Sequence, residues 1–282
     1  MALLRDAISE VSSRRRLIRY LVQGEMKKRG SDTLLGNLWW ILDPVLQMGV
    51  YLIFVAIIAR RPAPDYPLFI FAAILPWKWF SAVITDASTA VVRQERLIKQ
   101  IAFPKIVLPV ATTTAGVVGF VAGLVPLGAL LLFTVVDGGS PTRFNPILLV
   151  FWLPTIALVQ YAFTLAAAIL VAGANVFFRD LGNALGHFLR LWWFLSPGLY
   201  SLSWMDDAEL VKHYPIIRTL AGLNPFAILF ESYRAVVYGT AAGGPVAPDG
   251  LALAGLFLAS IVFIALAAIF FKRVEPNFAK VL

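Results

Sequence analysis

Long apolar runs separated by short polar segments fill most of the sequence. A helix that crosses a bilayer needs about 20 mostly apolar residues, and a window of about 19 residues finds such segments here. The predicted spanning helices cover residues 38–59, 67–92, 106–136, 146–178, 181–203 and 251–271. The pattern therefore predicts an all-α integral membrane protein with six transmembrane helices.

No internal repeat and no low-complexity linker divides these segments. We therefore expect a cytoplasmic N-terminal segment, residues 1–37, followed by a single transmembrane domain, residues 38–282. The third and fourth segments are longer than one crossing requires, which predicts tilt, extension beyond the bilayer, or kinks at Pro109, Pro126 or Pro154.

The composition argues against any soluble class. Of the 282 residues, 60% are hydrophobic and only 14% are charged, and the mean hydropathy is +0.80. A net charge of +8 would suggest a nucleic-acid partner in a soluble protein, but here the basic residues lie between apolar runs and are topology signals. We expect no nucleic-acid partner. The chain contains no cysteine, which excludes disulfides and thiolate chemistry.

Lys and Arg are unevenly distributed between the two sides of the membrane. If the N-terminus is cytoplasmic, 17 of the 24 fall on that side: eight in residues 1–37, four in 93–105, Arg179 and Arg190, and three near the C-terminus. This asymmetry predicts that both termini are cytoplasmic. The N-terminal stretch lacks the features of a cleaved signal peptide, so the first spanning helix is expected to direct insertion.

Residues 14–29 combine apolar and basic positions at helical spacing. Leu17, Ile18, Leu21 and Val22 share one face, while the basic residues gather elsewhere. This pattern predicts an amphipathic helix on the inner membrane surface. A flexible basic tail is the alternative. The residues expected to form this interfacial gate helix are Arg15, Arg16, Leu17 and Leu21.

Residues 204–240 are too polar or too interrupted to form a further spanning helix. The part from 215 to 240 is about half apolar and is broken at Gly222 and at Asn224-Pro225. Two short helices that dip into the outer leaflet and return would fit, because broken backbone at membrane depth is tolerated where it packs against protein. A helical hairpin on the outer surface is the alternative.

The basic segment RLIKQIAFPKIVLP, residues 96–109, lies between the second and third predicted spans. Its first half has the apolar spacing of a short amphipathic helix, carried by Leu97, Ile98 and Ile101, and Pro104 is expected to end it. We predict a short cytoplasmic helix over residues 93–103. A positively charged loop without regular structure is the alternative.

Motifs for covalent chemistry are absent from the sequence. It has no phosphate-binding G-x-x-x-x-G-K-[ST] loop and no H-E-x-x-H, and its two histidines, His187 and His213, are isolated. We therefore expect no catalytic residues, no metal site and no cofactor in this chain. Gly119/Gly123 and Gly182/Gly186 are small-xxx-small pairs, which permit close helix approach but occur often by chance.

Ionisable residues inside spanning segments are costly, and each is a candidate functional group. Asp43 precedes Pro44 in the first span, and Lys78 and Asp86 lie about two turns apart in the second. In two further pairs the partners share a helix face, His187 with Arg190 and Glu231 with Arg234. Structural pairing explains these residues about as well as a transport path does.

Aromatic residues are frequent near the predicted helix ends, where an interfacial belt is the ordinary explanation. Flat aromatic faces along a wide path would also suit a sugar or a lipid-linked substrate. The residues expected to line such a path are Trp39, Trp77, Lys78, Trp79, Trp192, Trp193 and Tyr200.

The order of segments resembles the ABC-2 type permeases that export polysaccharide and polyol phosphate, which include O-antigen, capsule, teichoic acid and galactan exporters. The opening run GSDTLLGNLWWILDPVLQMGVYLIFVAII, with its LG-x-LW-x-x-L-x-P pattern, resembles the opening of this family. The further similar blocks, in the family's order, are YPLFIFAAILPWKWF, ERLIKQIAFPKIVLPVAT, NVFFRDLGN, LRLWWFLSPGLYSL, LNPFAILFESYR and FFKRVEPNFAKVL. Lys78 departs from the pattern, since a neutral residue is expected there.

The resemblance implies a half-transporter in the bacterial cytoplasmic membrane. Two copies of this chain would assemble with two copies of a separate ATPase that binds ATP and Mg, and the polymer would pass between helices one and five of the two copies. The helix at 93–103 would dock in a cleft of the ATPase, with secondary contacts from the gate helix and from the NVFFRD loop. The implied docking residues are Arg96, Leu97, Ile98, Lys99, Ile101, Phe103, Arg179 and Asp180.

The sequence therefore favours the membrane subunit of an ATP-driven exporter of a lipid-linked cell-envelope polysaccharide. A membrane-embedded enzyme acting on a lipid-linked sugar is one alternative, but it would need a convergent carboxylate or histidine site that the sparse acidic residues do not offer. An ABC-2 exporter of drugs or small lipids is the other.

Overall fold

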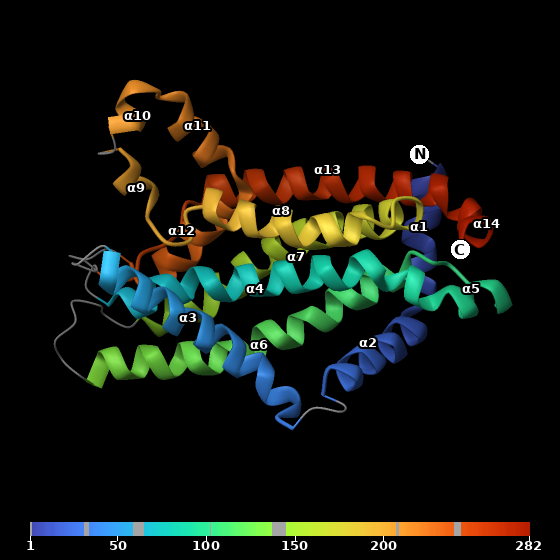
Figure 1. Ribbon diagram of the computed structural model, residues 1–282, viewed down its shortest axis with the longest axis horizontal. Helices are drawn as coiled ribbons and strands as arrows, with labels where there is room; N and C mark the ends of the chain where they lie inside the picture. The colour runs from blue at the N-terminus through green and yellow to red at the C-terminus, as the bar shows by residue number, and fades with distance from the viewer. Residues whose placement is uncertain are drawn as a thin grey trace.

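The computed structural model describes residues 2–30, 34–58, 65–101, 103–136, 145–206, 209–239 and 244–282, and its regular elements are helices (Figure 1). The long helices are α3 (Trp39–Ile58), α4 (Tyr66–Ala90), α6 (Val107–Val136), α7 (Pro146–Phe177) and α13 (Gly250–Val274). The shorter helices are α1 (Ala2–Ser13), α2 (Arg15–Gly30), α5 (Glu95–Gln100), α8 (Leu181–Leu195), α9 (Leu202–Met205), α10 (Glu209–His213), α11 (Ile216–Leu223), α12 (Pro225–Val237) and α14 (Phe278–Val281). Three 3-10 turns are η1 (Gly36–Leu38), η2 (Val92–Gln94) and η3 (Glu275–Asn277).

Five helices of the described residues are long and apolar enough to cross a membrane, and they correspond to the first four and the last of the predicted spans. The helix predicted over 181–203 differs, because α8 ends at Leu195. Ser196 has an extended backbone, as expected for a residue before proline, and Pro197 cannot continue the helix. With 15 residues α8 is about 22 Å long, shorter than a bilayer core.

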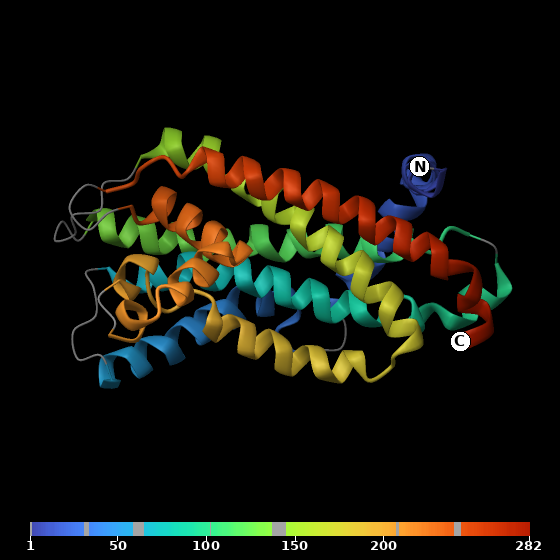
Figure 2. The same cartoon turned by 90° about the horizontal axis from the view of Figure 1, so that it is seen from above.

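The bundle is organised around α4. The most apolar window of α4 is 78% buried inside the protein, whereas that of α3 is only 11% buried. Helices α3, α6, α7, α8 and α12 all pack against α4. In Figure 2, α13 runs along one side of the bundle and α3 and α8 lie on the opposite side. The chain therefore has one central helix, and α3 lies at the rim.

The two ends of the bundle differ in what they carry. Both termini lie near α5 and α14 at one end, while α9, α10 and α11 project from the other (Figure 1). Helix α1 lies across the first end and contacts α13, and α2 packs against α6. The helix predicted over residues 14–29 is confirmed as α2, whereas α1 was not predicted.

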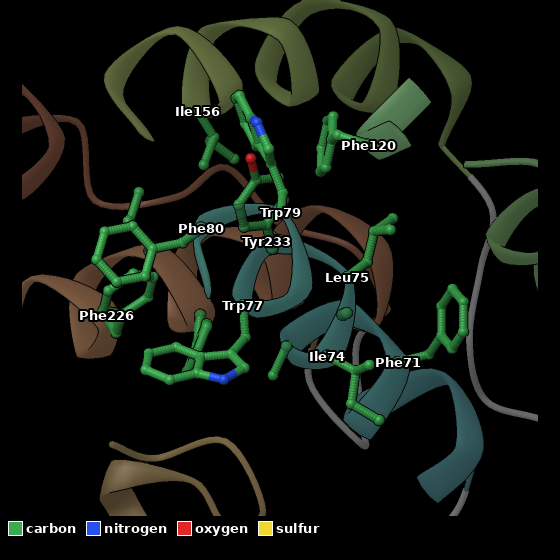
Figure 3. Packing of buried hydrophobic residues seen from close by; sticks show 14 of the residues in the cluster. Phe71, Ile74, Leu75, Trp77, Trp79, Phe80, Phe120, Ile156, Phe226 and Tyr233 are labelled. Atoms are coloured by element: carbon green, nitrogen blue, oxygen red, sulfur yellow. The ribbon is translucent and has the colours of Figure 1, made fainter. Parts of the chain in front are cut away.

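Aromatic side chains fill the core between α4 and α12 (Figure 3). The Trp77 ring lies 4.8 Å from the Phe226 ring, and Phe80 lies 4.7 Å from Phe226, both edge to face. Phe226 and Phe230 are fully buried. Because edge-to-face pairs favour particular geometries, these contacts fix how α12 sits against α4.

The break predicted at Asn224-Pro225 is present and separates α11 from α12. The Asn224 side chain caps α12 by accepting a hydrogen bond from the Phe226 N–H, and also accepts one from the Trp192 indole. The two helices of the hairpin differ in burial. Most of α12 is buried in the bundle, but Ile216, Leu220 and Leu223 of α11 are exposed.

Candidate functional site

A cavity of about 790 Å³ opens on one side of the bundle, between α3, α4, α6 and α8. Trp39, Asp43, Gln47 and Tyr51 line it from α3, and Trp77, Lys78, Trp79, Ser81, Thr85 and Asp86 line it from α4. Gly116, Gly119 and Phe120 of α6 and Gly186, Leu189, Arg190, Trp193 and Phe194 of α8 complete the wall. We call this cavity the groove. Its lining mixes aromatic rings with charged and polar groups.

The charges of the groove are largely paired. The Lys78 ammonium lies 2.5 Å from the Asp43 carboxylate, which links α4 to α3. Their side chains are 30% and 56% exposed, so the pair faces the groove and not the core. Asp86 lies 4.0 Å from the Arg93 guanidinium at the end that carries α5. The pairing of Asp43 with Lys78 across two helices was not predicted.

The groove brings together most of the residues predicted to line a path. Trp39, Trp77, Lys78, Trp79 and Trp193 all line it, but Trp192 and Tyr200 do not. The rings of Trp77, Trp79 and Trp193 are only 3–5% exposed, so most of their surface packs in the core. Trp192 donates its indole N–H to Asn224, and this bond fixes α8 to the start of α12.

The residues predicted to dock an ATPase lie at the end that carries both termini. The helix predicted over 93–103 is present as η2 and α5, which end at Gln100. Arg96, Lys99, Ile101, Arg179 and Asp180 are exposed, and Leu97 and Phe103 are half-buried. Ile98 is buried inside the chain, against Val91, Ile106 and Phe278 among others. Ile98 therefore contributes to this chain's own packing.

Two parts of this surface lie close to each other. Lys99 is ion-paired to Glu95 of α5 at 2.7 Å, and this hydrogen bond is the main cause of the lowered pKa of the Glu95 carboxyl, to which the nearby Arg179 charge also contributes. The loop before α8 and the helix α5 therefore form one surface with charges of both signs. On the neighbouring helix α2, Arg15 and Arg16 are exposed, whereas Leu17 and Leu21 are half-buried.

Arg234 is a buried cation whose environment the sequence did not reveal. Its guanidinium donates to the carbonyl oxygens of Phe69, Pro197, Gly198 and Tyr200 at 2.6–3.3 Å, and it lies 3.4 Å from the Glu231 carboxylate. It also stacks 3.7 Å from the centre of the Phe69 ring. Only the Glu231 contact follows from helical spacing. The carbonyls come from the start of α4 and from the 197–200 segment, so Arg234 holds the non-helical end of α8 in place.

No cluster of three His, Asp or Glu side chains that could hold a metal ion is present within the described ranges. His187 lies exposed on α8, and His213 contacts its neighbour Tyr214 edge to face. The arrangement offers a lined groove and a charged docking surface.

No protein-family profile matches the chain. It is 33% identical to an O-antigen export system permease protein, RfbA, from Myxococcus xanthus, over 97% of this chain and 98% of the relative. The chain belongs to the ABC-2 polysaccharide exporter permeases. Two RfbA permeases from Klebsiella pneumoniae are 24% and 27% identical to it, over 94% and 77% of this chain.

This membership confirms the resemblance noted in the sequence. As an ABC-2 permease the chain is a multi-pass membrane protein and a transport subunit, not an enzyme, which rules out the alternative of a membrane-embedded transferase. The groove and the α5 surface are therefore candidate parts of a transport machine.

Proposed function

We propose that this chain is the membrane subunit of an ATP-driven exporter that moves a lipid-linked cell-envelope polysaccharide of the O-antigen type out of the cytoplasm. The observation that carries the proposal is the near full-length similarity to RfbA of Myxococcus xanthus, which is named as an O-antigen export permease. The aromatic and polar lining of the groove supports it, since such a surface suits sugars and lipid-linked chains better than small ions.

In this proposal the protein spans the bacterial cytoplasmic membrane with both termini inside. The end that carries α1, α5 and α14 faces the cytoplasm, and the end that carries α9 to α11 faces outward. The support is the excess of Lys and Arg in the segments at the first end.

The transport path is proposed to lie between two copies of the chain. Each copy presents a groove with α3 and α8 among its walls, and two such grooves facing each other would enclose a wide passage. Charged groups such as Lys78 and Asp43 would then face the passage and avoid the lipid.

ATP and Mg are proposed to bind to a separate ATPase subunit, two copies of which dock on the α5 surface. Arg96, Lys99 and Ile101 are accessible for that contact, with Arg179 and Asp180 beside them. Ile98 and the half-buried Phe103 support the docking helix from inside this chain.

A gene deletion tests the function. In the bacterial host, deletion is expected to abolish the surface polysaccharide and to leave its lipid-linked form inside the cell, and a plasmid copy should restore display. Unchanged surface polysaccharide together with increased sensitivity to drugs would instead support a small-molecule exporter.

Paired substitutions test the docking surface. Ile101→Asp places a carboxylate on an exposed apolar position of the docking surface and should reduce co-purification with the ATPase at least about tenfold, a cost of about 1.4 kcal/mol or more. Gln100→Asp introduces the same charge at the neighbouring exposed position, the last residue of α5, and serves as the matched variant. Equal loss with both variants, or with neither, would remove Ile101 from the docking site.

A further inference from the structure

Glu275, in the turn η3 that follows α13, is a buried carboxylate with two partners. It is only 6% exposed. One oxygen accepts the backbone N–H of Lys105 at 2.7 Å, and the other lies 2.7 Å from the Lys272 ammonium. The first partner is 170 residues away in the sequence, in the segment that joins α5 to α6. A single side chain thus ties the C-terminal end of the chain to the connection behind α5.

The same network continues into the first helix. Lys272 also donates to both carboxylate oxygens of Glu10, at 2.8 and 2.9 Å, and this contact joins residues 262 positions apart. The Lys272 side chain is 13% exposed and that of Glu10 is 29% exposed, so the contacts are partly shielded from solvent. The polar chain therefore runs from Lys105 through Glu275 and Lys272 to α1. Figure 1 shows α1, α5 and α14 at the same end of the bundle.

Apolar packing follows the same route. Phe278 of α14 is fully buried in a cluster that includes Ile98 of α5 and Ala7 of α1. Its ring lies 6.0 Å from Phe177, which directly precedes the exposed 178–180 loop. The segment 275–278 consequently contacts the inner side of both parts of the docking surface.

Capping alone would explain only part of this arrangement. A carboxylate that accepts an N–H just before α6 is favourable at a helix N-terminus. Capping would need only one oxygen of Glu275 and no partner on α13 or α1. The second oxygen instead binds Lys272, which in turn binds Glu10 of α1. A buried network whose polar groups are all hydrogen-bonded is rigid.

We propose that Glu275 is a positioning residue that makes α5, the end of α13 and α1 move as one body when an ATPase displaces α5. The inference rests on the proposed docking role of α5. Displacement of α5 shifts the 101–105 segment, and the Lys105–Glu275–Lys272–Glu10 chain passes that shift to α1 and to the adjoining gate helix α2.

Spin-label distances test this directly, because the natural chain has no cysteine. Labels on Gln100→Cys and Ser9→Cys, both exposed, report the spacing between α5 and α1. Labels on Gln100→Cys and on Ile53→Cys, exposed on α3, report movement of α5 relative to a helix outside the proposed body. The full chain is measured in complex with its ATPase in nanodiscs, diluted with unlabelled chain, without nucleotide and after vanadate trapping.

In the wild type we expect the α5–α3 distance to change on trapping and the α5–α1 distance to stay constant. Glu275→Ala should make the α5–α1 distance change as well, and should lower surface polysaccharide about threefold to thirtyfold at equal membrane level. Glu275→Gln keeps an acceptor for the Lys105 N–H but loses the charge that pairs with Lys272, so an intermediate effect is expected. If the alanine variant does not assemble, the glutamine variant provides the test. Asp6→Asn, exposed on the same helix as Glu10, should behave as the wild type.

The outcomes separate this inference from the proposed function. If α5 moves on trapping but the Glu275 variants keep a constant α5–α1 distance, Glu275 does not link the elements and the inference alone is overturned. If α5 does not move in the wild type, the docking role of α5 is overturned, and the inference with it.

Discussion

At the scale of single residues, the charged groups of this membrane protein fall into two environments. Lys78 and Asp43 form a pair that faces the groove, where substrate or water can reach it. Arg234 is only 2% exposed, and four backbone carbonyls take up its hydrogen bonds. A guanidinium offers five N–H donors in a fixed planar arrangement, whereas an ammonium offers three. The Lys78–Asp43 pair can therefore contact a substrate in the groove, whereas the Arg234 charge fixes the backbone carbonyls that surround it.

Replacement of Arg234 is expected to destabilise the fold severely. Arg234→Met leaves four carbonyl oxygens and the Glu231 carboxylate without their donor, which should cost more than about 3 kcal/mol. Arg234→Lys should recover only part of this loss because the lysine ammonium lacks the planar five-donor arrangement of a guanidinium. Thermal unfolding in detergent measures the effect.

Arg218→Met provides the comparison for Arg234. Arg218 pairs with Asp206 at 2.9 Å, but both side chains are largely solvent-accessible, at 36% and 58%. Its replacement should cost less than about 1 kcal/mol. Similar melting temperatures for the Arg234 and Arg218 variants would show that the buried network does not stabilise the protein.

At the scale of elements, contact between α4 and α6 depends on particular glycines. A Cβ on Gly116 would collide with Val83 and touch the Trp79 ring, and one on Gly123 would collide with Leu75. A Cβ on Gly119 would meet nothing within 4 Å. Of the Gly119/Gly123 pair noted in the sequence, only Gly123 lies at the contact with α4. The close approach of the two helices involves Gly116 and Gly123.

Alanine substitutions should separate these positions. Gly116→Ala forces the stiff Val83 side chain or the helix to shift, which should destabilise the protein by about 1–3 kcal/mol. Gly119→Ala adds a good helix former in open space and should be neutral or stabilising by up to about 1 kcal/mol. Thermal unfolding of the two variants decides, and a reversed order would mean that α6 does not approach α4 at Gly116.

The sequence was a good guide to elements and a poor guide to their partners. Length and hydropathy are local properties, so α3, α4, α6, α7 and α13 were predicted to within a few residues. The end of α8 was missed because a window of about 19 residues averages across Pro197. The Lys78–Asp43 pair and the acceptors of Arg234 depend on how distant helices pack, and helical spacing within one segment carries no such information.

At the scale of the whole molecule, one copy of the chain does not form a complete passage. Its groove holds Lys78, Asp43, Asp86 and Arg190, and α3 and α8 form two of its walls. The α3 window is only 11% buried, and Phe188, Leu191, Phe194 and Leu195 of α8 are more than half exposed. Charged groups exposed to hydrocarbon cost several kcal/mol each, so this side needs a protein or water neighbour. The opposite side, along α13, is apolar and suits lipid.

Disulfide cross-linking should therefore distinguish the two sides of the bundle. Because the natural chain has no cysteine, Phe194→Cys on α8 and Leu258→Cys on α13 can be compared without further changes. The two side chains are similarly exposed, at 58% and 66%, so they differ in location and not in accessibility. If a second copy covers the α3 and α8 side, oxidation in native membranes should convert most of the Phe194→Cys protein to a dimer and leave Leu258→Cys monomeric. Cross-linking at Leu258→Cys alone would place the second copy on α13, and the passage could not then lie between two grooves.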